Sequence, residues 1–146
     1  VTGRGAEAGR RALGAAGVRP EELDLIIGAT ISADTISPGL GGMVQSRLGA
    51  SCPAFDMNVA CPGFLFALDV AAGFFARKTV KKVLVVSAER MSGLLDWTDR
   101  STCCIFGDGA GAAVLGEGDA YLASELHTMG DDNVISIPTA WNNSPL

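Results

Sequence analysis

The sequence predicts an α/β fold, a layered α/β/α sandwich built around a mostly parallel sheet. Its 146 residues are 48% hydrophobic and only 18% charged, with 19 Gly, a composition that suits buried strands and close-packed helices. Short apolar runs with β-branched centres alternate with segments of helical periodicity, as in parallel sheets covered on both faces. No linker, repeat or low-complexity stretch divides the chain, so we expect one domain over residues 1–146.

The first elements follow from periodicity. Residues 6–16 place small and apolar side chains at helical spacing, and Gly17 ends the pattern. Residues 23–30 (LDLIIGAT) form a short apolar run typical of a central parallel strand. Residues 31–41 mix Ser, Thr, Asp, Pro and Gly, which indicates a loop, and a short helix is expected from there to Gly49.

The next three elements are a strand, a helix and a strand. We expect a strand over 54–60 (AFDMNVA) and a helix over 62–78, which is apolar on nearly every side and should therefore be buried. Residues 82–88 (KVLVVSA) are typical of another buried strand.

The last part of the chain is expected to be β-structure. After a polar loop or short helix over 89–101, strands are predicted at 102–107 and 111–116, separated by a Gly-Asp-Gly-Ala turn, and at 121–128. The predicted order is α-β-α-β-α-β-β-β.

Charge, cysteine use and hydropathy exclude several classes of protein. A formal charge of −5 argues against a general affinity for nucleic acid, because phosphate binding depends on an excess of Lys and Arg. The four Cys form no CxxC pair and accompany a single His, so neither a metal site nor a disulfide framework is indicated. No apolar run is long enough to span a membrane, and the first residues, VTGRG, lack the apolar stretch that a signal peptide would have. We expect a cytoplasmic protein that needs no cofactor, and because the chain opens without Met directly into helix-like sequence, we expect a fragment.

Cys61 is the strongest candidate for chemistry. It lies between the strand at 54–60 and a helix whose first residue is expected to be Pro62, a position that Pro favours. At the N-cap, the sulfur would face the positive end of the helix dipole and free N–H groups, which lower the pKa of a thiol. The alternative is a small buried residue, because free Cys is commonly buried. The residues alone leave both interpretations open.

Two segments carry a family resemblance: NVACPGFLFAL around Cys61, and LLDWTDRSTCCIFGDGAGAAVLG downstream. They resemble the active-cysteine and Gly-rich segments of the β-ketoacyl-acyl carrier protein synthase III family, and the similarity extends over nearly all of 6–130. The resemblance implies the thiolase fold, of which this chain would be most of the N-terminal half with the crossing into the second half. It also implies a homodimer that condenses an acyl-coenzyme A (acyl-CoA) starter with malonyl-acyl carrier protein through a thioester on Cys61, in fatty-acid or polyketide initiation.

The resemblance also assigns substrate-binding residues. Met91 and Phe106 would line the acyl pocket, with core packing as the alternative, and Arg100 would meet the adenine end of coenzyme A, with an ion pair to Asp96 or Asp99 as the alternative. Ser37 stands where well-known relatives carry a Phe that reaches into the partner's acyl pocket. A larger pocket is then expected, unless Ile36 or Leu40 fills the space.

Other features have structural interpretations. The glycines of 106–116 lack the following helix of a nucleotide-binding loop, and are expected to permit a tight turn beside the nucleophile. Cys103 and Cys104 would point to opposite faces of a strand, in the core. The basic cluster, defined as Arg77, Lys78, Lys81 and Lys82, follows a helix end and is structural by default, although it could also dock an acidic carrier protein.

The family's decarboxylating His and Asn are not recognisable in this chain. His127 is the single His and matches a segment that is not catalytic, and Asn142 and Asn143 stay unassigned. We therefore expect that these 146 residues alone do not condense. The alternatives are another thiolase-fold acyltransferase or a non-catalytic ketosynthase-like dimer partner.

Overall fold

The computed structural model describes residues 1–131, 133, 134, 136 and 137. The helices are α1 (Thr2–Ala16), α2 (Leu40–Leu48) and α3 (Gly63–Ala76), and the short 3-10 helices are η1 (Pro20–Glu22) and η2 (Met91–Gly93). The strands are β1 (Leu25–Ala29), β2 (Ala54–Met57), β3 (Lys82–Arg90) and β4 (Asp108–Gly116). No helix among these residues is long and apolar enough to cross a membrane.

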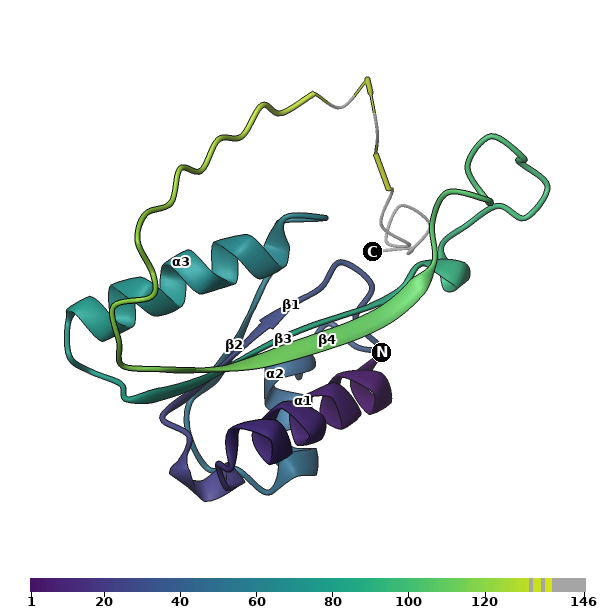
Figure 1. The fold of residues 1–146 in the computed structure, drawn as a ribbon. Helices are drawn as coiled ribbons and strands as arrows, with labels where there is room; N and C mark the ends of the chain where they lie inside the picture. Colours follow the sequence, from purple (N-terminus) through teal and green to yellow (C-terminus); the bar gives the residue numbers. More distant parts are fainter. Residues whose placement is uncertain (132, 135, 138–146) are drawn as a thin grey trace.

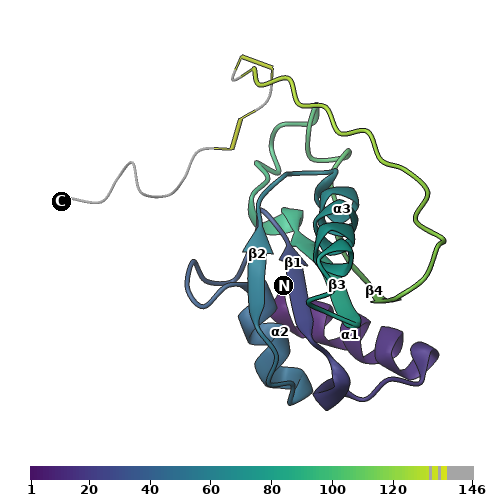
Figure 2. The ribbon, with the colours of Figure 1, turned by 90° about the vertical axis from the view of Figure 1, so that its left-hand side faces the viewer.

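The four strands form one sheet in the order β2-β1-β3-β4. β1 runs parallel to both β2 and β3, whereas β4 is antiparallel to β3. Helix α3 covers one face of the sheet, and α1 and α2 cover the other (Figures 1 and 2). The predicted α/β/α sandwich with a mostly parallel sheet is confirmed.

Successive side chains along each strand point to opposite faces of the sheet, so the core consists of two apolar layers. In β1, Ile26 faces α1 and α2, whereas Leu25 and Ile27 face α3. Each β1 residue is buried, so the strand is covered on both sides, which agrees with its continuous apolar sequence. Strand β3 repeats the pattern, with Leu84 and Val86 in the first layer and Val83 and Val85 in the second.

The first two helices are defined well by their ends. Helix α1 and helix α2 both stop at a glycine in the left-handed conformation, Gly17 with φ 64° and Gly49 with φ 74°. Glycine adopts this conformation without the steric cost that a Cβ would bring. Both predicted stops are therefore confirmed, while α1 starts earlier than expected, at Thr2.

The glycine-rich segment differs from the prediction. Residues 102–105 form turns and residues 106 and 107 lie outside any helix or strand, so the predicted strand is absent. There is no turn at Gly-Asp-Gly-Ala, because β4 runs unbroken from Asp108 to Gly116. Gly109 pairs with Glu89 and Gly111 with Ser87, and the space where their Cβ atoms would lie is open. The glycines thus leave one face of β4 without side chains at these two positions.

A further expected strand, at 121–128, is also absent. This segment lies outside any helix or strand and is tied to α3 through Asp69, whose carboxylate accepts hydrogen bonds from Tyr121 Oη at 3.0 Å and from the Ser124 hydroxyl. The Ser124 hydroxyl and then Tyr121 lower the pKa of Asp69. Side-chain hydrogen bonds, not backbone hydrogen bonds of a sheet, hold this segment against α3.

Helix α3 is less buried than its composition indicates. Gly63, Ala67 and Ala71 face the sheet, whereas Leu65 on the outer side is 61% exposed. The prediction of burial on nearly every side is wrong for α3, because the sheet covers one face of the helix and outer residues such as Leu65 stay exposed.

Candidate active site around Cys61

Cys61 is exposed in a tight turn between β2 and α3. Strand β2 ends at Met57, so the observed strand is shorter than the predicted one at 54–60. Helix α3 begins at Gly63, with Pro62 as its N-cap. The expected N-cap position of Cys61 is wrong by one residue. The turn is closed by the Gly63 N–H, which donates to the Ala60 carbonyl at 3.1 Å.

The turn is fixed by an unusual backbone angle and a close contact. Ala60 has φ 48°, in the left-handed region that is uncommon for residues other than Gly. A Cβ at Gly63 would lie 3.1 Å from the Cβ of Ala29, so the start of α3 lies directly against the end of β1. Within the described part of the chain, the Cys61 N–H has no hydrogen-bond acceptor, and it is free to donate to a bound oxyanion.

The other three thiols differ from Cys61 in position. Cys52 is buried, and burial raises the pKa of its thiol. Cys103 and Cys104 lie in a turn, where Cys104 is exposed and Cys103 half-buried, so their predicted placement in a strand of the core is wrong. Neither Cys52 nor Cys103 is as accessible as Cys61.

Several candidate residues lie at the same edge of the sheet as Cys61. Strands β1, β2 and β3 end at this edge and β4 begins there (Figure 1). Met91 follows β3 and is buried, at 8% exposure, whereas Phe106 precedes β4 and is half-buried. A shallow hollow of about 310 Å³ adjoins them, lined by Ser87, Glu89 and residues 107–111.

The loop from residue 31 to residue 39, which carries Ser37, is held by carboxylates at three places. Glu89 accepts the Ile31 N–H at its start, at 2.8 Å. Asp34 accepts the Thr2 N–H at 2.7 Å, a hydrogen bond that lowers the pKa of its carboxyl. At the far end, Asp56 of β2 accepts the N–H groups of Leu40 and Gly41, at the start of α2.

Ser37 itself is exposed in this loop. Of the two neighbours that could fill the space left by an aromatic ring, Leu40 is only 2% exposed and packs in the core, so it is not available. Ile36 is 74% exposed and is not held by core packing. Only Ile36 therefore retains the alternative role.

Arg100 lies in the loop between η2 and β4, which projects beyond the sheet (Figure 1). Its side chain is exposed, and it forms no ion pair with any described residue. Asp96 and Asp99 instead accept hydrogen bonds from neighbouring hydroxyls, chiefly those of Thr98 and Ser101, which lower the pKa of each carboxyl. The alternative of an ion pair with these two residues is therefore not observed.

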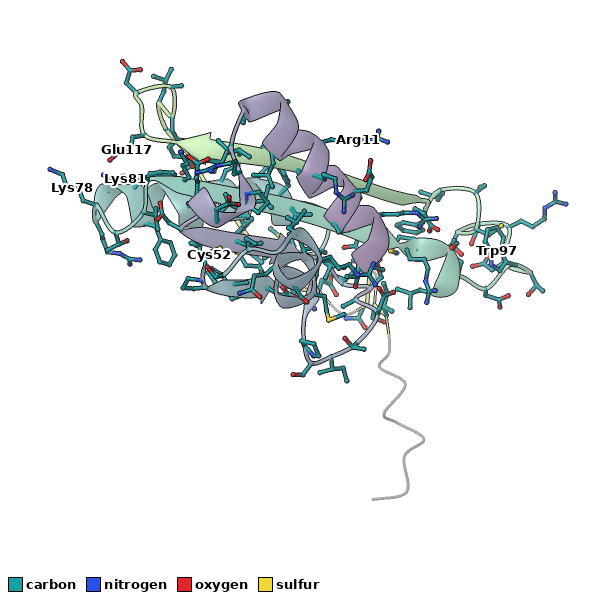
Figure 3. All side chains as sticks on the ribbon, turned by 90° about the horizontal axis from the view of Figure 1, so that it is seen from below. Arg11, Cys52, Lys78, Lys81, Trp97 and Glu117 are labelled. Carbon is teal, nitrogen blue, oxygen red and sulfur yellow. The ribbon has the colours of Figure 1, made fainter. Side chains whose placement is uncertain are left out.

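The basic cluster lies far from this edge. Lys78 and Lys81 are at the opposite end of the molecule from Trp97, which marks the projecting loop (Figure 3). Lys82 pairs with Glu22 at 2.7 Å, and Arg77 lies over the ring of Phe74 at 4.4 Å. These contacts favour the structural interpretation of the cluster.

Two remaining predictions concern His127 and the two asparagines at 142 and 143. His127 is exposed and lies 2.8 Å from Glu125, while Asn142 and Asn143 fall outside the described residues. Within the described residues, no group of three His, Cys, Asp or Glu side chains could hold a metal ion.

Glu89 and Asp56 were not among the residues selected from the sequence. Both are acidic residues that end or occupy a strand next to a loop, and both accept backbone N–H groups across the sheet edge. For Glu89, the sequence offers one signal: a charged residue directly follows the apolar run KVLVVSA.

The layered α/β/α fold, with an exposed cysteine between a parallel strand and the next helix, is shared with solved enzymes of the thiolase fold. The synthase III of Aquifex aeolicus is 45% identical, with a TM-score of 0.80 over 82% of this chain and 39% of its own. The priming β-ketosynthase of the R1128 polyketide pathway is 44% identical, with a TM-score of 0.76 over 80% of this chain and 35% of its own.

Sequence comparison gives the family. The model of 3-oxoacyl-(acyl carrier protein) synthase III matches residues 55–130. The β-ketoacyl-(acyl carrier protein) synthase III of Vesicomyosocius okutanii is 45% identical over 94% of this chain and 44% of its own length. The chain belongs to the synthase III family. It spans less than half the length of these relatives.

Proposed function

We propose that the natural chain carrying residues 1–146 condenses an acyl-CoA starter with malonyl-acyl carrier protein, with Cys61 as the nucleophile. The observation that carries the proposal is the exposed Cys61 thiol, set between β2 and α3 in a chain of the synthase III family. The similarity to a priming polyketide ketosynthase and to synthase III enzymes supports chain initiation in either pathway.

The chemistry has two covalent stages. In the first, the Cys61 thiolate attacks the thioester carbonyl and a new S–C bond forms. The bond from the carbonyl carbon to the coenzyme A sulfur breaks, and coenzyme A leaves as its thiolate, which then takes a proton from water. In the second, the malonyl C–C bond to carboxylate breaks, CO₂ leaves, and its electron pair forms the new C–C bond to the acyl carbonyl. The bond from that carbonyl to Cys61 Sγ then breaks, which returns the thiolate.

Backbone geometry at Cys61 suits both stages. Each stage passes through a tetrahedral intermediate with negative charge on the former carbonyl oxygen. A preorganised N–H donor lowers the barrier to such an intermediate by a few kcal/mol. The free N–H of Cys61 is a donor of this kind. Pro62 contributes no N–H, so the second donor must come from outside this turn.

The decisive experiment follows both stages separately. Acetyl-CoA labelled in the acyl group should first load the protein, as seen by intact mass, and malonyl-acyl carrier protein should then release the label as a β-ketoacyl product with CO₂. Loading without condensation would instead indicate a stand-alone acyltransferase of the same fold. Absence of loading would indicate a non-catalytic partner and contradict the proposal.

Assembly and location complete the proposal. Ser37 can contribute to an acyl pocket through a partner subunit only in a homodimer, so the proposal includes one. An exposed thiol nucleophile must stay reduced, and a reducing cytoplasm provides that condition.

Substitution of Arg100 by Ala should weaken binding of acyl-CoA while loading from a short acyl-pantetheine stays nearly unchanged. If Arg100 meets only the nucleotide end, its loss should appear in KM more than in kcat. Steady-state loading kinetics with both donors measure the difference. Arg11→Ala, an exposed Arg on α1 that pairs with Glu7 at 2.9 Å, is the matched control. Equal losses with both donors would exclude this role.

Ser37 should permit longer or branched acyl groups than an aromatic residue would. Each additional buried CH₂ contributes up to about 0.8 kcal/mol, so a series of straight and branched acyl-CoA donors competing for Cys61 should favour the larger ones. Ser37→Phe should restore preference for acetyl-CoA, whereas Ser46→Phe, an exposed control on α2, should not. A preference for acetyl-CoA in the unmodified protein would refute the enlarged pocket.

A further inference from the structure

Glu89 forms a dense set of hydrogen bonds at the edge of the sheet that carries Cys61. It stands on the penultimate position of β3, half-buried, and its carboxylate accepts hydrogen bonds from four groups of one short segment. Thr30 Oγ lies at 3.2 Å, the Ile31 N–H donates at 2.8 Å, the Ser32 N–H donates at 3.1 Å, and the Ser32 hydroxyl also donates.

This set connects two strands through their ends. Ser32 Oγ in turn accepts the Arg90 N–H at 2.7 Å, so the segment after β1 is bonded to two successive residues of β3. Thr30 and Ser32 are each only 9% exposed. Buried N–H and hydroxyl groups that lose their partner cost free energy, and the carboxylate therefore fixes the exit of the chain from β1.

The same exit adjoins the nucleophile. Thr30 follows Ala29, and Ala29 is the residue against which Gly63, at the start of α3, is packed. Beyond Ser32, the loop continues to Asp34, Ser37 and the start of α2. Residues 31–33 therefore lie between Ala29, which packs against the start of α3, and the rest of the loop that carries Ser37.

We infer that Glu89 is a positioning residue that fixes the loop at 31–39 and thereby sets which acyl groups Cys61 accepts. The inference rests on the proposed function. Glu89 takes no part in bond making, and its contribution lies in selectivity between acyl donors more than in the loading of the smallest one.

The substitution Glu89→Gln tests the hydrogen-bond set with almost no change in size. Ile31 is bonded to one carboxylate oxygen and the other three groups to the second oxygen. An amide has one oxygen that accepts and an NH₂ that only donates. Depending on which way the amide lies, either the Ile31 N–H loses its acceptor, or the Ser32 N–H keeps only its second acceptor, Thr30 Oγ at 3.1 Å. Amide hydrogen exchange at residues 31–33 should accelerate by at least roughly tenfold.

Two further variants separate the inference from general damage. Ser32→Ala removes one hydroxyl but keeps the backbone donors, so it should accelerate exchange less than Glu89→Gln. Glu117→Gln is the matched control. Glu117 is exposed and lies at the opposite end of the molecule from Trp97 (Figure 3), so its substitution should leave amide exchange at 31–33 unchanged.

Donor selectivity is then measured in the natural chain that carries residues 1–146. The measured quantity is kcat/KM for branched donors divided by kcat/KM for acetyl-CoA. In Glu89→Gln this ratio should fall toward one, because KM for the branched donors rises, while acetyl loading of Cys61 persists. Unchanged exchange at 31–33, or faster exchange with an unchanged donor ratio, would overturn the inference. If the unmodified protein shows no loading at all, the proposed function fails instead, and the exchange result still reports on the Glu89 hydrogen bonds.

Discussion

Replacement of Cys61 by Ala should abolish acyl loading and condensation while the protein stays folded. The side chain is exposed and touches no core layer, so its loss removes the nucleophile without leaving a cavity. Peptide mass mapping after incubation with acyl-CoA should locate the acyl group on Cys61 in the unmodified protein and nowhere in the variant. Circular dichroism should be the same for both.

Cys104→Ala is the matched control, because Cys104 is the other exposed thiol. It should load at the normal rate. An acyl group found mainly on Cys104, Cys103 or Cys52 would refute the assignment of the nucleophile.

Gly28→Ala should destabilise the protein by about 2–3 kcal/mol, within the range of overpacked cores. Gly28 lies in β1, and a Cβ there would lie 2.6 Å from Asp56 Oδ1 and 2.9 Å from the backbone nitrogen of Gly41. Asp56 cannot move away without releasing the start of α2, whose N–H groups it accepts. Urea unfolding followed by circular dichroism should show the loss as a lower midpoint.

Gly14→Ala is the control, and it should stabilise the protein instead of destabilising it. Gly14 lies in α1, is exposed, and has open space around its Cβ position. Alanine is the better helix former, so this variant should gain up to about 1 kcal/mol. A midpoint for Gly28→Ala that is equal to or higher than the unmodified one would contradict the packing described for β1, β2 and α2.

Those parts of the fold that depend on local chemistry could be predicted from the sequence. The buried strands β1 and β3 follow from continuous β-branched runs, and the stops of α1 and α2 follow from Gly17 and Gly49. The strand β4 could not be predicted in full, because Gly109 and Gly111 favour turns locally and are held extended only by pairing with β3.

The position of the candidate nucleophile could be predicted better than its surroundings. Cys61 could be placed between a strand and a helix by local pattern, and the resemblance of NVACPGFLFAL to the family selects it as the candidate nucleophile. Glu89 and Asp56 could not, since their partners lie 57 and 15 residues away in the sequence and depend on strand register. The exposed outer side of α3 shows the same limit, because apolar periodicity does not say which neighbours are present.

The left-handed angle at Ala60 has a consequence for how closely the sulfur is located. A non-glycine residue in this region costs about 1–2 kcal/mol, which a glycine at position 60 would avoid. Glycine would also let the peptide between β2 and α3 sample many more orientations. Alanine narrows that distribution, so the protein gives up some stability at residue 60 and in return holds the reacting atom of the next residue within a smaller volume.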